Sequence, residues 1–210
     1  MITPVTPQFF DGFLLGIVLF SAPGPKDALV LRQGASGGSL WGVVAICVIA
    51  DAVLIAIGAA GVGVLLDSHP RVVSAMLLAG AAYLVWFGGQ RMLACIRNTS
   101  TPNGVDGAPN IHRSLLNTTL MLSFANPYAW LDTIVLIGST GAATPVAARP
   151  SFFIGTMSAS CIWFMILATG ARKLTGVFKY PKVWRWLDAA IALLMAYLTA
   201  GLLRDAIRSF

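Results

Sequence analysis

The sequence contains few charged residues, few cysteines and few histidines. Charged side chains make up 10% of the 210 residues, whereas hydrophobic side chains make up 57% and the mean hydropathy is +0.80. Ordinary soluble domains carry about 25% charged residues, so this composition excludes such a domain and favours a chain within a lipid bilayer. The net charge of +6 does not indicate a nucleic-acid partner, because the basic residues are divided among several loops.

The scarcity of thiols and imidazoles limits the chemistry that the chain can perform. Cys47, Cys95 and Cys161 are isolated and form no C-x-x-C motif, so a thiol-redox relay, which needs two thiols within disulfide reach, is only an alternative interpretation. His69 and His112 have no partner at metal-ligand spacing. Ser-His and Glu-x-x-His patterns are absent from the apolar runs, which argues against an enzyme. No metal or cofactor is predicted.

Six apolar runs are long enough to cross a membrane as helices, at roughly 17 to 25 residues per crossing. We therefore predict an all-α membrane protein with six transmembrane helices in a single domain over residues 1–210. The first ten residues lack the basic segment of a cleaved signal peptide, so the first run is expected to stay in the mature protein. The runs cover residues 9–30, 40–66, 72–90, 114–138, 151–171 and 186–203.

The loops between these runs differ in positive charge. The first, third and fifth loops hold nine basic residues, whereas the termini and the other two loops hold four. Since cytoplasmic loops are enriched in lysine and arginine, the first set is predicted to be cytoplasmic and both termini to lie outside.

The fourth run is interrupted by Asn126 and Pro127. Asparagine is a favoured helix N-cap and proline is favoured at the first helical position, so the pair predicts that one helix ends and another begins inside the membrane. A broken helix leaves backbone polar groups free, and transporters use such breaks to build substrate sites. Asp132 follows five residues after the proline, and Tyr128 lies at the predicted helix start.

The first run contains a similar interruption at Pro23, Gly24 and Pro25, followed by Lys26 and Asp27. The two prolines each remove a backbone donor, and the glycine permits a close approach or a positive φ. With Gly24 as the cap, the acid falls at the third helical position, where the helix N-terminus stabilises it. A break or kink is therefore predicted here too.

The two interruptions coincide when the sequence is shifted by 102 residues, which places Gly24 on Asn126 and Pro25 on Pro127. Three helices per half is an odd number, so the halves would be inverted in the membrane. Inverted repeats with matching breaks indicate a site near the middle of the bilayer. The predicted repeats cover residues 9–93 and 114–205, with a linker at 94–113.

Two acids lie within apolar runs, where a carboxylate is costly and needs a partner. For Asp51 we favour a functional role, with a structural pair to Lys26 or a protonated acid as alternatives. Asp188 is expected to be an interfacial acid near a helix start. Ser160 and Trp163 in the fifth run are expected to serve packing.

The sequence resembles the L-lysine exporter (LysE) family over nearly its whole length. The resemblance is carried by the six runs, the Pro-Gly-Pro…Gln-Gly stretch of residues 23–34, the Ala-Asp at 50–51 and the Asn-Pro-x-x-x-Leu-Asp at 126–132. The last motif and Pro-Lys-Val-Trp-Arg-Trp at 181–186 resemble the lysine and arginine exporter branch. The resemblance implies inner-membrane efflux of basic amino acids, driven by the proton gradient or the membrane potential.

One departure from the family pattern affects the expected substrate. Family members typically have Gln-Asn after Pro-Gly-Pro, whereas this chain has Lys26 and Asp27. A lysine in the cavity would repel a basic amino acid or act as an internal counter-ion for Asp51, whereas the aspartate would attract one. Export of neutral amino acids or of another small amine is therefore kept as an alternative.

These observations lead to one mechanistic hypothesis. The substrate's α-carboxylate is expected to dock on free backbone N–H groups near residues 126–128, and its cationic end to pair with Asp51 or Asp132. A proton taken up by one of these acids would exchange for the substrate, and one repeat would rock against the other. The expected partners are a small amino acid, the lipid bilayer and the coupled proton; an oligomer is left open.

Overall fold

The computed structural model of the protein describes residues 7–22, 24–35, 40–62, 65–66, 69–97, 111–124, 126–177 and 180–208. Within these ranges the chain is helical and contains no strand. Two predicted features lie outside them, namely Pro23 and residues 98–110 of the expected linker. The elements are α1 (Pro7–Phe20), α2 (Pro25–Ala35), α3 (Trp41–Ile57), η1 (Gly58–Val62), α5 (Pro70–Ile96), α6 (Ile111–Phe124), α7 (Pro127–Trp130), η2 (Leu131–Ile137), α8 (Gly138–Ala143), η3 (Val146–Ala148), α9 (Arg149–Lys173) and α10 (Pro181–Arg208).

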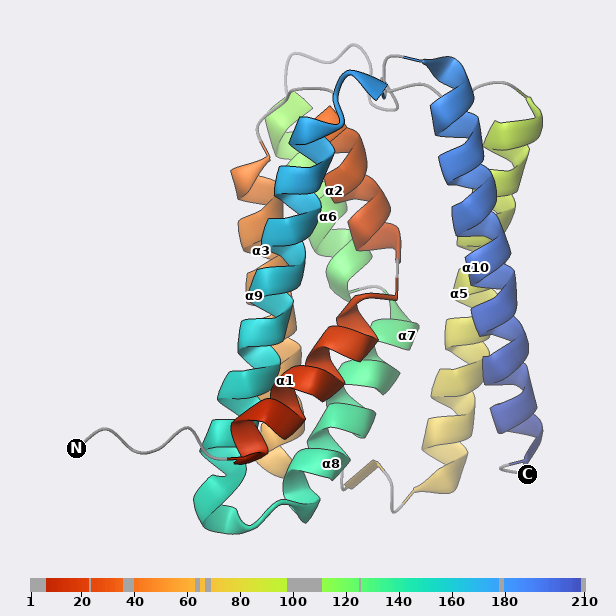
Figure 1. The fold of residues 1–210 in the computed structure, drawn as a ribbon. Coiled ribbons are helices and arrows are strands. Elements are labelled where there is room, and N and C mark those ends of the chain that lie inside the picture. Colours follow the sequence, from red (N-terminus) through yellow and green to blue (C-terminus); the bar gives the residue numbers. More distant parts are fainter. Residues whose placement is uncertain are drawn as a thin grey trace.

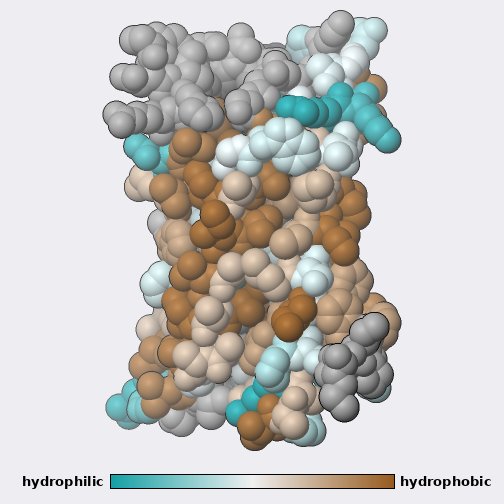
Figure 2. Space-filling view, turned by 90° about the vertical axis from the view of Figure 1, so that its left-hand side faces the viewer, coloured by the Kyte–Doolittle hydropathy of each residue, from teal (hydrophilic) through white to brown (hydrophobic). Residues whose placement is uncertain are grey.

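Four helical segments are long and apolar enough to cross a membrane, as judged from length and composition. They are Trp41–Val62, Arg71–Ile96, Val146–Lys173 and Pro181–Arg204. Two bent pairs would bring the number of crossings to six if each pair is one span. One face of the molecule agrees with this arrangement, because a predominantly hydrophobic band lies between hydrophilic residues near its upper and lower ends (Figure 2).

The two bent pairs are α1 with α2 and α6 with α7 to α8. The axis turns by 77° in the first pair and by 54° in the second. In Figure 1, α1 rises from the lower end to mid-height and α2 continues to the upper end, while α6 to α8 run the opposite way. The two bends therefore lie at about the middle of the bundle's height.

The helices pack in two groups. The bent pair α1 and α2 lies against α9, and α3 packs on α6 and η2, while α5 and α10 form a separate pair along one side (Figure 1). Glycines allow the closest approaches. A Cβ on Gly12 of α1 would lie 2.0 Å from the Phe152 carbonyl oxygen of α9, and a Cβ on Gly138 of α8 would lie 3.0 Å from the Gly58 Cα of η1.

Candidate functional site

A small cavity lies at the meeting point of the two bends. Its volume is about 50 Å³, which is room for a few water molecules. Residues from the end of α1, the start of α2, α7, η2 and α9 line it, including the polar residues Lys26, Asp27, Asn126, Tyr128, Asp132 and Thr133. The two sequence segments predicted to interrupt helices therefore contribute to one cavity.

The first bend is held together by Asp27. Its Oδ2 accepts a hydrogen bond of 2.6 Å from the Gly24 amide, and its Oδ1 accepts one of 2.8 Å from Trp163 Nε1 of α9. Only 5% of Asp27 is exposed. The carboxylate thus uses both oxygens to fix the start of α2 against α9.

Lys26 and Asp51 form an ion pair between α2 and α3. The other carboxylate oxygen of Asp51 accepts a 2.8 Å hydrogen bond from Ser160 of α9, and the residue is completely buried. The Lys26 ammonium also lies 5.5 Å from the centre of the Phe164 ring, a cation–π contact. Of the alternatives that the sequence left open, the geometry corresponds to Lys26 as an internal counter-ion for Asp51.

The second bend is capped by Asn126. Its side-chain oxygen accepts a 3.1 Å hydrogen bond from the Tyr128 amide, and Pro127 occupies the first helical turn. This is the N-cap that the residue pair predicts. The cap uses the Tyr128 amide in this conformation, so a substrate carboxylate could take that amide only after the cap is released.

Asp132 is the carboxylate of the cavity that is least constrained. It lies on the π-helix η2, half-buried, one turn after Tyr128, whose hydroxyl interacts with it. Among the described residues it forms no ion pair, unlike Asp51. Single π-helical turns inside α-helices often occur at functional sites.

The charges around the cavity favour a cation. The lining of the cavity includes the carboxylates of Asp27 and Asp132 and the ammonium of Lys26, whose positive charge is neutralised by Asp51. A buried carboxylate attracts a positively charged partner, because an unpaired charge at this depth is costly. The arrangement can therefore hold a small cation next to Asp132.

Two side chains of α9 contribute to the site although the sequence assigned them to packing. Ser160 bonds to Asp51 and Trp163 bonds to Asp27. The packing interpretation was wrong for both residues, because the Ser160 hydroxyl and the Trp163 indole N–H each donate a hydrogen bond to a buried carboxylate. The signal available in the sequence was their polarity inside an apolar run, three residues apart and thus on one helix face.

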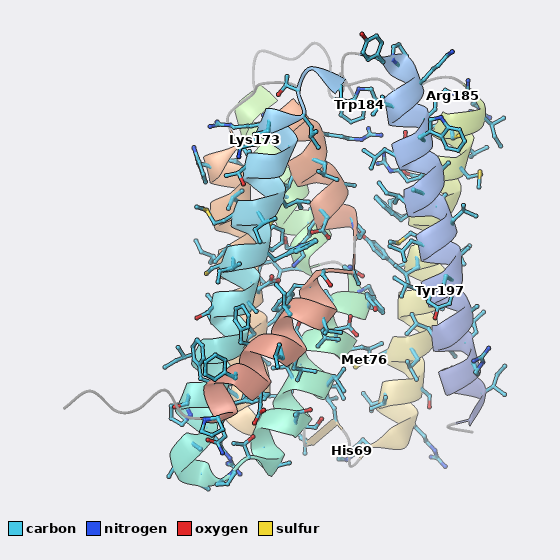
Figure 3. The ribbon with its side chains drawn as sticks, in the orientation of Figure 1. His69, Met76, Lys173, Trp184, Arg185 and Tyr197 are labelled. Carbon is cyan, nitrogen blue, oxygen red and sulfur yellow. The ribbon has the colours of Figure 1, made fainter. Side chains whose placement is uncertain are left out.

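A second charged cluster lies at the basic end of the bundle, and it corrects the expectation for Asp188. This residue is fully buried on α10, not interfacial. Both of its oxygens accept hydrogen bonds from Arg32 of α2, at 2.7 and 3.0 Å, and Arg91 of α5 lies 3.7 Å from one of them. This end of the molecule also carries Trp184, Lys173 and Arg185, whereas His69 lies at the other end (Figure 3).

The three cysteines are unpaired, at Cys47, Cys95 and Cys161. No group of three or more histidine, cysteine and acidic side chains that could hold a metal occurs among the described residues. Neither alternative chemistry considered from the sequence therefore gains support from the geometry.

Comparisons with known proteins agree with the sequence resemblance. The family model described as LysE type translocator matches residues 17–206. The lysine exporter LysE of Corynebacterium efficiens is 29% identical over 93% of this chain and 97% of its own length. A candidate amino-acid transporter of Mycobacterium bovis is 37% identical over 83% and 86%, and the arginine exporter protein ArgO of Pectobacterium atrosepticum is 31% identical over 89% and 92%. No solved structure matches the chain significantly.

Proposed function

Because the chain belongs to the LysE family of translocators, and within it to the lysine and arginine exporter branch, we propose that it exports basic amino acids, lysine or arginine, across a bacterial inner membrane. Members of this family are exporters and not enzymes. The observation that carries the proposal is the cavity at the two bends, which both Asp27 and Asp132 line.

The proposed binding mode assigns the substrate's cationic end to Asp132. Asp51 is the less suitable partner in this conformation, because Lys26 and Ser160 occupy both of its oxygens. The substrate's α-carboxylate would take the Tyr128 amide once the Asn126 cap is released. A proton bound by Asp132 after the substrate leaves would complete an exchange cycle, with the membrane potential as the alternative driving force.

We propose that each bent pair is one broken span, which gives six spans in two inverted repeats. The packing supports this, since the first broken span lies on α9, the second span of the other half, and the second broken span lies on α3 in the corresponding way. Rocking of one half against the other would then open the cavity to each side in turn.

The proposed orientation places the Lys173 end in the cytoplasm. The basic residues at the end of α9 and the start of α10 belong to this end, among them Arg172, Lys182 and Arg185, whereas Arg149 and Arg204 lie toward the other end. This excess agrees with the positive-inside tendency. The start of α1 and the end of α10 lie toward the opposite end (Figure 1).

The test is transport in vesicles containing the purified protein. We expect saturable transport of labelled lysine or arginine, loss of that transport in Asp132→Asn, and near-normal transport in Asp11→Asn, a matched change at an exposed acid of α1. Unchanged transport in Asp132→Asn at normal protein levels would refute the assignment of this residue.

Export of neutral amino acids is the second candidate, and the positive charge of Lys26 beside the cavity favours it. A panel of labelled amino acids distinguishes the two. If neutral amino acids alone are transported, the substrate class is that of the second candidate, although the assignment to the family stands.

A further inference from the structure

The amino-acid substrate carries a carboxylate as well as a cation, and the cavity offers that carboxylate little. The Gly24 amide is used by Asp27, the Tyr128 amide is used by Asn126, and the Lys26 ammonium is paired with Asp51. Each of these donors would have to release its present partner first. In this conformation, a group that can receive the carboxylate therefore has to lie outside the cavity.

Arg32 and Arg91 each have an N–H group that is not hydrogen-bonded within the described residues. In the part of the chain that the structure describes, they share the single carboxylate of Asp188, so this part of the structure has one positive charge in excess. The Nε atoms of both arginines are buried and have no hydrogen-bond partner among the described residues. Leaving a buried donor unsatisfied is costly, and a functional role or a bound water or ion is among the reasons why a native structure retains one.

The two arginines differ in how closely they contact Asp188. Arg32 binds both oxygens of Asp188, at 2.7 and 3.0 Å, and lies near the Trp184 ring. Arg91 lies 3.7 Å from one oxygen and 4.8 Å from the centre of the Phe87 ring. Arg91 can thus turn to a second oxyanion while Arg32 keeps Asp188 neutralised.

The cluster is connected to the cavity through one face of α2. Pro25 lines the cavity, Ala28 packs in the apolar cluster between α5 and α10, and Arg32 lies one turn further on. Residues at this spacing share a helix face. The arginines therefore lie beyond an apolar barrier from the cavity, roughly 10 Å along α2 at 1.5 Å per residue.

We propose that Arg91, supported by Arg32, binds the α-carboxylate of the substrate at the basic end of the bundle, before the substrate reaches the cavity. Guanidinium groups suit this task because their planar N–H groups match the geometry of a carboxylate. The proposal rests on the proposed function, since it assigns a second station to the same substrate. It makes the protein selective for amino acids over simple amines.

The test compares two competitors that differ in the carboxylate alone. Transport of labelled lysine into vesicles is inhibited with unlabelled lysine or with lysinamide, in which a neutral amide replaces the carboxylate. For the wild-type protein we expect lysine to inhibit at concentrations about tenfold or more below those of lysinamide, the range for a hydrogen bond to a charged group. Arg91→Gln should make the two competitors nearly equal, and Arg91→Lys should give an intermediate ratio.

A matched control uses Arg71→Gln, which removes an exposed charge near the other end of the same helix and should leave the ratio unchanged. Equal inhibition of the wild-type protein by lysine and lysinamide overturns the proposal. An Arg91→Gln protein that transports lysine more slowly but keeps the full ratio of the two inhibitory concentrations also overturns it, because the role of Arg91 would then be structural. The exporter assignment survives both results. A wild-type protein that transports no basic amino acid overturns that assignment instead, and this proposal with it.

The phosphate of an anionic lipid has the same oxyanion chemistry as a carboxylate. The competition is therefore repeated in vesicles of phosphatidylcholine alone and in vesicles that also contain phosphatidylglycerol. An unchanged ratio supports the substrate carboxylate as the ligand. A ratio abolished by the anionic lipid assigns the arginines to a headgroup and overturns the proposal.

Discussion

Asp51 is satisfied by two side chains from two other helices, and each contributes in a different way. Lys26 of α2 neutralises the charge, and the Ser160 hydroxyl of α9 occupies the second oxygen. A buried carboxylate that loses a hydrogen bond retains the full cost of its desolvation. The stability of the protein should therefore respond to small changes at either partner.

Ser160→Ala tests the hydroxyl. We expect it to lower the free energy of unfolding by about 1 to 2 kcal/mol, since it leaves one oxygen of a buried carboxylate without a donor. The measurement is thermal unfolding of the purified protein in detergent. Ser158→Ala is the control on the same helix, because the Ser158 hydroxyl is bonded only to the Ile154 carbonyl on the exposed face. Equal effects of the two changes would contradict the prediction.

Lys26→Met tests the ion pair. Removing one partner of a buried pair typically costs about 3 to 5 kcal/mol, because the other charge is left uncompensated. The double variant Lys26→Met with Asp51→Asn should regain much of the loss, since neither charge is then present. Thermal unfolding of the two single variants and the double variant gives the coupling energy. Additive losses would show that the two side chains do not stabilise one another.

At the scale of helices, close contact between α1 and α9 depends on residues without a side chain. A Cβ on Gly155 of α9 would lie 2.1 Å from the Phe9 carbonyl oxygen, a distance that requires the two backbones to separate. Small residues allow helices in membranes to approach closely and gain van der Waals contacts. This packing fixes α1 and, through it, the start of the first bend.

Gly155→Ala should destabilise the protein by several degrees in thermal unfolding, because α1 is pushed away from α9. Gly170→Ala lies on the same helix, where a Cβ meets no atom within 4 Å. Since alanine favours a helix by about 1 kcal/mol over glycine, this control should be neutral or stabilising. If the Gly155→Ala protein unfolds at the same temperature as the wild-type protein, α1 and α9 can adjust to the added methyl group without loss of stability.

The sequence predicted well where helices occur, but it predicted poorly which side chains of different helices contact one another. Proline and asparagine act on their own backbone, so the interruptions at Pro25 and Pro127 can be read locally. Partners such as Ser160 and Trp163 depend on how α9 is rotated. A helix that is apolar on all sides gives no periodic signal for that rotation.

Asp188 illustrates the same limit. Its position soon after the tryptophans at 184 and 186 suggested a headgroup location, but the structure buries it against arginines from α2 and α5. Those helices are distant in the sequence, so no local pattern identifies them. Long-range charge pairing is therefore the part of the site that required the three-dimensional arrangement.

At the scale of the whole molecule, the positive end defines the expected orientation. Single cysteines placed at Lys173 and at Val146, in a variant with all three native cysteines changed to serine, should react with a membrane-impermeant thiol reagent from opposite sides. We expect Lys173→Cys to be protected in intact cells and Val146→Cys to be labelled, because the basic end should face the cytoplasm. The reverse labelling pattern would contradict the orientation.

The cysteine-free variant also tests the redox alternative. Cys47 is buried and the other two cysteines are partly exposed and unpaired, so we expect their replacement by serine to preserve transport. The measurement is the initial rate of lysine transport in vesicles. Complete loss of transport at a normal protein level would indicate that the thiols take part in the function of the protein.

The apolar cluster around Leu84, Phe87 and Met195 separates the arginines from a cavity that has space for only a few water molecules. Because apolar side chains disfavour an unbroken file of water, the resting protein should be a poor conductor of hydrogen ions. A cell could then keep many copies in its energised membrane without short-circuiting the voltage that powers its other pumps.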